Sequence, residues 1–149
     1  MKKLLILTLA LAFMLSACGG VKTRVPDDPY AKESQAIVEE WIAAYHSLDA
    51  EALLSLYSND ITWKDCGFNT SCDVERLIDL QGVVPPSFKE KGFKVEAQSY
   101  MVTAMGRFAV LQVMYAEPEG GPATSTPATV ILEFKDGKIL NETWYYIMG

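Results

Sequence analysis

The fold is decided by residues 37–57, which read IVEEWIAAYHSLDAEALLSLY. Apolar residues recur in this stretch at intervals of three and four with charged residues between them, which is typical of amphipathic helices. In the first helix they are Ile37, Val38, Trp41, Ile42, Tyr45 and Leu48. We expect Ser34 to cap this helix and Asp49 to open a second one. The second helix would keep its period through Ala52, Leu53, Leu56 and Tyr57.

The sequence after the second helix changes its period. Residues 61–65 alternate like a short strand, and a third helix is expected over residues 73–80, before Pro85 and Pro86 forbid continuation. Four long strands with period two are then predicted at 93–103, 107–117, 126–135 and 138–147. Their connections are Met105-Gly106, Gly120-Gly121-Pro122 and the hairpin turn Asp136-Gly137. Helices followed by an antiparallel meander predict an α+β domain with the helices on one face of the sheet.

The N-terminus carries a pattern typical of bacterial lipoprotein signals. Lys2 and Lys3 precede an apolar run over residues 4–15, which ends in Leu15-Ser16-Ala17-Cys18. A transmembrane helix needs about 20 apolar residues, so this run is too short for one. A cleaved secretory signal without lipid is the other alternative. We expect residues 1–17 to be removed and Cys18 to carry acyl chains such as palmitate.

The signal also predicts where the protein works and how it is divided. The mature chain would be exported and lipid-anchored to the cell membrane or the outer membrane. Residues 18–33 lack a sustained apolar period and contain Pro26 and Pro29, so we expect a lipidated cysteine and tether there. Residues 34–149 would form one domain, which is a normal size for a single hydrophobic core.

Charge and cysteine content exclude several classes of function. Removal of residues 1–17 leaves 132 residues with 11 basic and 19 acidic side chains, a net charge of −8. This balance is opposite to that of nucleic-acid-binding domains, so no nucleic-acid partner is expected, and membrane attachment should come from the acyl chains. Cys66 and Cys72 are predicted to form a local disulfide in the exported compartment, with two buried thiols as the alternative. His46 is the lone histidine, so neither a metal site nor a cofactor is expected.

The order of elements resembles the nuclear-transport-factor-2-like superfamily, especially its SnoaL-like and ketosteroid-isomerase-like bacterial members. The resemblance depends on residues 37–57, on Asp60-Ile61-Thr62-Trp63-Lys64-Asp65 and on the closing hairpin over residues 130–139. It implies a cone in which a curved antiparallel sheet wraps the long first helix and leaves an apolar pocket open at one end. Such apolar patterns specify a fold well and an activity poorly.

The resemblance also assigns three positions of the isomerase site. In those enzymes a carboxylate moves a proton while a tyrosine and a protonated aspartate hold the oxyanion. Asp65 matches the base, Trp41 takes the place of the tyrosine, and the aspartate position falls near Val130. A valine donates no hydrogen bond, so the proton-transfer set is incomplete and we expect binding rather than catalysis. Asp65 could equally cap a turn at the end of its strand.

Ten side chains are predicted to line the pocket, on the basis of strand alternation and of the family pattern. They are Trp41, Tyr45, Trp63, Met101, Gln112, Met114, Leu132, Glu142, Trp144 and Tyr146. The same aromatic residues could also fill an ordinary core. Glu142 must be solvated, paired or protonated because burying an unpaired charge is costly, and Arg107 is a conceivable partner. Gln112 could orient a ligand or pair with a cross-strand neighbour, and His46 is expected to be solvated.

Three functions remain open from the sequence. The leading one is a membrane-tethered domain that binds a small, largely apolar ligand, or a segment of an envelope protein, in an aromatic pocket. The second is an enzyme with Asp65 as general base, Trp41 or Gln112 polarising the substrate, and Glu142 as a second carboxylate. The third is a module that dimerises through the outer face of its sheet. Apolar area for that dimer would come from Leu111, Val113, Tyr115, Tyr145 and Ile147.

Overall fold

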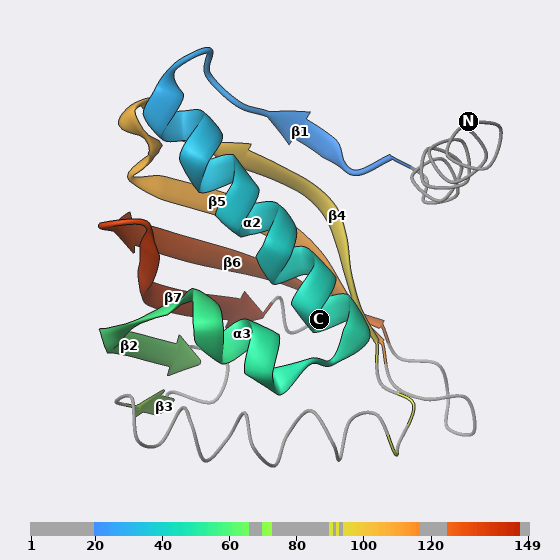
Figure 1. Ribbon diagram of the computed structural model, residues 1–149. Coiled ribbons are helices and arrows are strands. Elements are labelled where there is room, and N and C mark those ends of the chain that lie inside the picture. The colour runs from blue at the N-terminus through green and yellow to red at the C-terminus, as the bar shows by residue number, and fades with distance from the viewer. Residues whose placement is uncertain are drawn as a thin grey trace, which may run out of the picture.

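A computed structural model describes residues 20–65, 70–72, 94–116 and 125–146, together with Glu90 and Gly92 (Figure 1). This part of the chain contains two α-helices and seven strands, together with the short 3-10 helix η1 (Ala104–Gly106). In chain order they are β1 (Lys22–Arg24), α2 (Pro29–Ser47), α3 (Ala50–Leu56), β2 (Tyr57–Asp65), β3 (Thr70–Cys72), β4 (Lys94–Val102), β5 (Phe108–Ala116), β6 (Ser125–Lys135) and β7 (Lys138–Tyr146).

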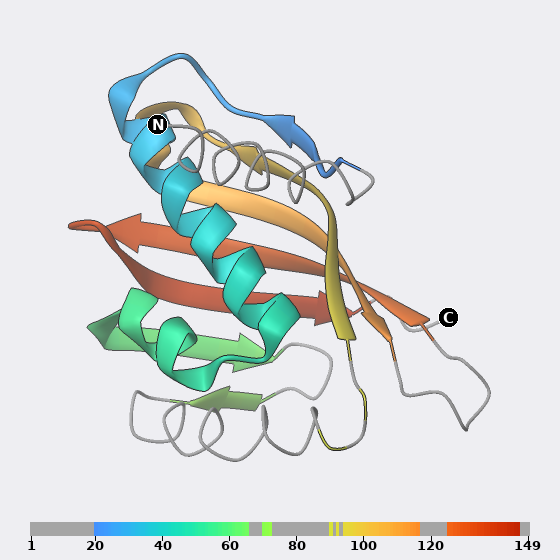
Figure 2. The same ribbon diagram turned by 45° about the vertical axis from the view of Figure 1, so that its right-hand side comes forward.

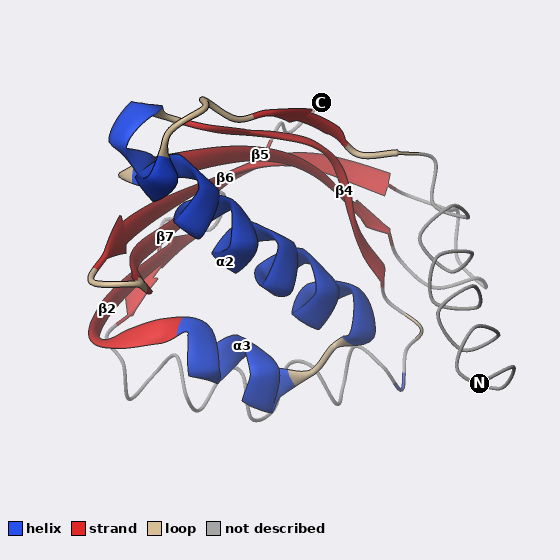
Figure 3. Ribbon diagram, turned by 45° about the horizontal axis from the view of Figure 1, so that its top comes forward, coloured by secondary structure: helices blue, strands red, loops and turns tan. Residues whose placement is uncertain are grey.

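The strands form one curved sheet in the order β1-β4-β5-β6-β7-β2-β3. The central meander β4-β5-β6-β7 is antiparallel, as predicted, whereas β1 pairs parallel with β4 and β2 pairs parallel with β7. The sheet is therefore mixed rather than wholly antiparallel. The two helices lie together on its concave side, so that α2 crosses the strands and is wrapped by them (Figures 1 and 3). This confirms the predicted α+β cone.

Helix α2 begins five residues before the expected cap at Ser34. Asp28 has extended backbone angles and its carboxylate accepts a 2.8 Å hydrogen bond from the N–H of Ala31, while Pro29 occupies the first turn. An acidic cap followed by proline is a favourable helix start. Ser34 instead lies buried inside the helix, where its hydroxyl donates a hydrogen bond to the carbonyl of Gly106. The helix ends where Leu48 adopts a left-handed conformation with φ 53°.

The predicted tether over residues 18–33 is wrong for most of its described part. Lys22, Thr23 and Arg24 form an edge strand in register with Ser99, Tyr100 and Met101 of β4 (Figure 2), and Pro29 already lies in α2. Strand β1 carries no apolar pattern because all three of its residues are exposed. An edge strand with one neighbour needs only backbone hydrogen bonds to be held in place.

The remaining predicted elements agree closely with the structure. Asp49 caps α3 by accepting a 3.0 Å hydrogen bond from the N–H of Ala52. Strands β4 to β7 lie within two residues of their expected bounds. Asp136 and Gly137 have φ values of 52° and 71°, as the two-residue hairpin turn between β6 and β7 requires. The helix expected at 73–80 and the loop at 120–122 lie outside the described residues.

Candidate functional site

A glutamate occupies the centre of the core. Glu142 lies in β7, in register with Trp63 of β2 on one side and with Leu132 of β6 on the other. Its side chain points to the concave face beneath α2 and is 0% exposed. A fully buried carboxylate is rare in proteins and needs polar partners to offset the loss of its hydration.

Five aromatic side chains supply those partners, and we call them with Glu142 the carboxylate cluster. Oε2 of Glu142 accepts from the indole N–H of Trp41 at 2.9 Å and from the hydroxyl of Tyr57 at 2.7 Å. Oε1 accepts from Tyr45 at 3.1 Å, from Trp63 at 3.1 Å and from Trp144 at 2.6 Å. The chain contains three tryptophans, so every one of them donates to this carboxylate.

The cluster stabilises a negative charge with neutral donors. Five neutral donors on two oxygens occupy the acceptor positions of the carboxylate. The two ion pairs of the described residues, Lys32 with Asp27 and Arg107 with Glu133, both lie elsewhere. Burial raises the pKa of Tyr57 well above its ordinary value, and the negative charge of Glu142 raises that pKa further. Tyr57 therefore stays a hydrogen-bond donor at neutral pH.

The rings of the cluster also pack on one another. The centroid of Trp41 lies 4.3 Å from that of Tyr45 and 5.9 Å from that of Trp144, and Tyr146 stacks on Trp144 at 6.0 Å. Trp41 and Tyr45 come from α2, Tyr57 and Trp63 from β2, and the others from β7. The cluster thus joins the long helix to two neighbouring strands. The ring of Trp63 is half-buried at the outer limit of the cluster, as is the neighbouring Tyr146.

The structure brings together seven of the ten predicted pocket residues on the concave side. They are Trp41, Tyr45, Trp63, Leu132, Glu142, Trp144 and Tyr146. The prediction places Met101, Gln112 and Met114 on the wrong side, because β4 and β5 both turn the opposite face inward. Ala109, Leu111 and Val113 are buried, so Gln112 and Met114 lie on the outer face with exposed Met101, and Gln112 pairs with Thr129 at 3.0 Å.

Other sequence predictions about side chains are corrected or confirmed. Arg107 does not pair with Glu142: its guanidinium lies 3.3 Å from the carboxylate of Glu133, at the surface. His46 is exposed in the last turn of α2, as expected. Leu111 and Val113 are buried in the core, so they cannot serve a dimer through the outer face, whereas Tyr145 is exposed there.

Several predicted positions lie at the boundary of the described residues or outside them. The backbone of Asp65 ends β2, in register with Trp144, and its catalytic role stays a prediction. Cys72 lies in β3, but Cys66 and Cys18 are outside the described residues, as are the side chains of Tyr115 and Ile147. The disulfide and the lipidation therefore also stay predictions.

Tyr57 is the member of the cluster that the sequence analysis missed. The helical period predicts it at the end of the second helix, whereas it is the first residue of β2 and lies in register with Ile139. The signal that could have found it is alternation with Ile61 and Trp63, once β2 is extended backwards through residues 57–60. The polar sequence Ser58-Asn59-Asp60 concealed that strand.

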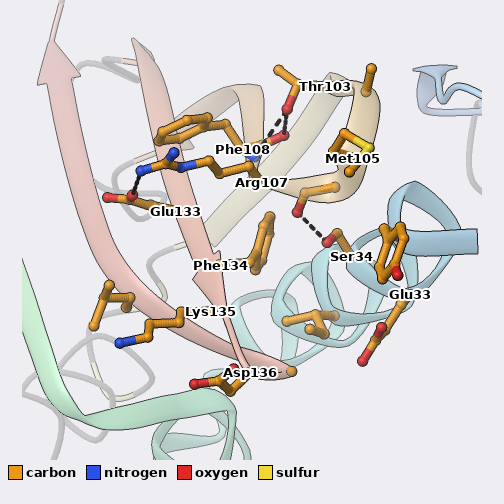
Figure 4. Close-up of a pocket in the computed structure, with 16 residues that line it drawn as sticks. Glu33, Ser34, Thr103, Met105, Arg107, Phe108, Glu133, Phe134, Lys135 and Asp136 are labelled. Atoms are coloured by element: carbon orange, nitrogen blue, oxygen red, sulfur yellow. Dashed lines mark hydrogen bonds and ion pairs between the residues drawn. The ribbon is translucent and has the colours of Figure 1, made fainter.

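A separate open hollow was also missed. It has a volume of about 930 Å³ and lies where the start of α2, the turn between β4 and β5, and the β6–β7 hairpin meet (Figure 4). Ile37, Phe108 and Phe134 give it apolar walls, and Glu33 and Lys135 lie at its border. None of the ten predicted pocket residues lines it. Exposed Met105, at φ 65°, stands at its edge.

Comparison with known proteins identifies the family. The family model of the SnoaL-like domain matches residues 38–142. The chain belongs to the SnoaL-like domain family. The matched SnoaL-like region begins in α2 and ends at the buried glutamate, so it contains every member of the carboxylate cluster except Trp144. No curated protein matches the chain.

Solved structures show the same SnoaL-like fold at low sequence identity. An NTF2-like protein from Mesorhizobium loti has a TM-score of 0.69 at 14% identity and covers 86% of this chain and 100% of its own. A protein with a ketosteroid isomerase-like fold from Catenulispora acidiphila, in complex with trimethylamine, has a TM-score of 0.61 at 20% identity over 75% of this chain and 85% of its own. An LEH-like epoxide hydrolase from M. tuberculosis has a TM-score of 0.63 at 17% identity and covers 78% of this chain and 84% of its own.

The geometry limits what this SnoaL-like domain can do chemically. The indole N–H of Trp41, which takes the place of the isomerase tyrosine, is used by Glu142. Gln112 lies on the outer face, and Glu142 is enclosed by its donors. The enzyme hypothesis therefore loses its second carboxylate, Glu142. It also loses Trp41 and Gln112, the two groups that would polarise a substrate. Among the described residues no group of three or more His, Cys, Asp and Glu could hold a metal ion, and no helix could cross a membrane.

Proposed function

We propose that the protein is an exported lipoprotein, anchored through Cys18, whose SnoaL-like domain binds a small and largely apolar ligand. The observation that carries this proposal is the set of five hydrogen bonds to Glu142. These bonds satisfy the polar atoms of the aromatic side chains within the protein. What remains for a ligand is the ring surface of half-buried Trp63 and Tyr146, which favours apolar contacts over polar ones.

The buried charge of Glu142 selects among apolar ligands. At an effective dielectric constant of about 20, two unit charges about 8 Å apart interact by about 2 kcal/mol. An anionic ligand beside the cluster would lose this energy, and a cation would gain it and contact the half-buried indole ring of Trp63. We therefore propose a neutral or cationic ligand. The trimethylamine complex of the Catenulispora relative is consistent with this choice.

Three molecules of one shape test the proposal. They are 3,3-dimethylbutan-1-ol, 3,3-dimethylbutan-1-amine and 3,3-dimethylbutanoate, which share one carbon skeleton and end in a neutral, a cationic and an anionic group. Each is titrated into the full lipoprotein in nanodiscs while tryptophan emission is recorded, because all three tryptophans contact Glu142. We expect saturable changes for the alcohol and the amine, and binding about 30-fold weaker for the anion than for the neutral alcohol, which corresponds to about 2 kcal/mol.

The matched control is the Glu142→Gln variant, which keeps the shape and removes the charge. In the folded variant the amine and the carboxylate should bind with equal affinity. If the variant does not fold, the salt dependence of binding to the wild type gives the same information, since screening should weaken the amine and leave the alcohol unchanged. The absence of a saturable emission change with all three molecules would refute the proposal.

A further inference from the structure

The position of β1 fixes where a lipid anchor would leave the domain. Cys18 precedes Lys22 by four residues, and four extended residues span at most about 14 Å. Lys22 is held in register with Ser99 by the parallel pairing of β1 with β4. The connection from Cys18 to β1 can thus span at most about half the length of a nine-residue strand, and it is far shorter than the tether expected over residues 18–33. A membrane bound through Cys18 would have to lie close to this edge of the sheet.

The outer face of β1 and of the neighbouring parts of β4 and β5 forms a distinct surface at this edge of the sheet, and we call it the β1 edge surface. A shallow hollow of about 280 Å³ lies on it, lined by residues of β1, β4 and β5. Sheet register places Lys22 beside Ser99 and Gln112, and Arg24 beside Met101 and Val110, on the outer face. Both cations are exposed, and Met101 is 41% exposed.

Charge at this edge differs from that of the whole chain. The chain has a net charge of −6, but three of the exposed side chains at the edge, Lys22, Arg24 and Lys94, are cationic and Glu96 is anionic. Asp27 and Asp28 follow β1 at the end that leads to α2, where Asp27 pairs with Lys32 and Asp28 caps the helix. The local excess of positive charge therefore lies nearest to Cys18 along the chain.

We infer that the β1 edge surface is the membrane-facing side of the protein. Lys22 and Arg24 contact the phosphates of anionic phospholipids, and Met101 enters the headgroup region between them. Basic residues close to an anionic bilayer are attracted to it within a Debye length, which the short connection to Cys18 enforces. The β6–β7 hairpin then points away from the bilayer. This inference rests on the proposed lipidation of Cys18.

Photo-crosslinking of the full lipoprotein in vesicles tests the inference. Met101→p-benzoylphenylalanine places the probe on the β1 edge surface, and Asp136→p-benzoylphenylalanine places the same probe at the exposed hairpin. In vesicles of mixed phosphatidylcholine and phosphatidylglycerol we expect lipid adducts at position 101 and none at 136. Equal adduct yields at the two positions would overturn the inference.

A charge variant and the mass of the N-terminus complete the test. The double variant K22Q/R24Q removes two cations and should lower the adduct yield at position 101 about 30-fold in the mixed vesicles, which corresponds to about 2 kcal/mol, and should leave it unchanged in pure phosphatidylcholine. Mass spectrometry of the mature N-terminal peptide separates two failures. An acylated Cys18 without adducts at position 101 contradicts the inference alone, whereas an N-terminus without acyl mass contradicts the proposed anchoring as well.

Discussion

Trp63 and Glu142 lie side by side in β2 and β7, and the indole of Trp63 donates a 3.1 Å hydrogen bond to the carboxylate. The same carboxylate accepts four further hydrogen bonds, two of them from α2. One charged residue on a sheet strand therefore positions the helix that the sheet encloses. In most domains this task belongs to apolar packing, and here packing and a buried hydrogen-bond network share it.

Glu142→Gln should destabilise the protein by about 2 kcal/mol. The amide oxygen can replace Oε1 and keep three donors, but the amide nitrogen then faces Trp41 and Tyr57. The Tyr57 hydroxyl can rotate to accept, whereas the indole N–H of Trp41 cannot, and one buried unsatisfied donor costs about 1–3 kcal/mol. Urea unfolding measures the change. As control, Glu96→Gln at an exposed position should alter stability by less than about 0.5 kcal/mol.

Stability should fall above pH 10, and Tyr57 should account for part of that loss. Its pKa is raised in the folded state, so above pH 10 the unfolded chain releases a proton that the folded chain keeps. The loss approaches about 1.4 kcal/mol per pH unit for one such group. Burial, aided by the hydrogen bond to Glu39, raises the pKa of Tyr100 to about 12, so its contribution ends near that pH.

Tyr57→Phe and Tyr100→Phe separate the two contributions. Each variant should show a shallower decline of unfolding free energy between pH 10 and pH 12, and the double variant the shallowest, in urea titrations at fixed ionic strength. Tyr57→Phe should also cost about 2 kcal/mol at pH 7, because it removes a hydrogen bond to a charged group. An alkaline slope identical to that of the wild type in both variants would contradict the assignment.

Gly106→Ala should destabilise strongly. A Cβ atom at this position would lie 2.2 Å from the carbonyl oxygen of Tyr30, and φ is already 61°. Gly137→Ala is the matched control, since φ is 71° there but the nearest atom to a new Cβ is the flexible carboxylate of Glu33 at 3.4 Å. We expect about 1 kcal/mol from the backbone conformation alone at Gly137, and several kcal/mol at Gly106. Similar melting temperatures for the two variants would argue against the close approach of α2 to η1.

Asp28→Ala should lower stability by about 1 kcal/mol, because the cap of α2 is lost. Ser34→Ala tests the alternative start of the helix. There the loss should reflect a buried hydrogen bond to Gly106 and leave the helix content unchanged by circular dichroism. If instead Asp28→Ala has no effect on stability, the helix does not begin at Pro29.

Much of the fold could be predicted because its signals are local. The period of α2, the cap at Asp49 and the Asp136-Gly137 turn each depend on a few neighbouring residues, and the structure confirms them. Edge strand β1 could not be predicted in this way. Its three exposed residues carry no periodic pattern, and its place depends on backbone pairing with residues 77 positions further along.

The candidate site was predicted in part for the same reason. Glu142, Trp144 and Tyr146 were assigned to one inward face by alternation along a single strand, and they lie there. The face of β5 was assigned wrongly because both of its faces carry apolar residues, so alternation alone does not show which one is buried. The convergence of five donors on Glu142 depends on three segments far apart in sequence, and no local pattern shows it.

The most direct test of the carboxylate cluster is a ¹H–¹⁵N spectrum of the full chain in detergent, with attention to its three indole N–H signals. All three protons donate to Glu142, so we expect all three signals downfield of free indole, slow to exchange with solvent, and all shifted by Glu142→Gln. A signal at the free-indole position that exchanges rapidly and ignores the substitution would contradict the cluster and, with it, the binding surface proposed on top of it.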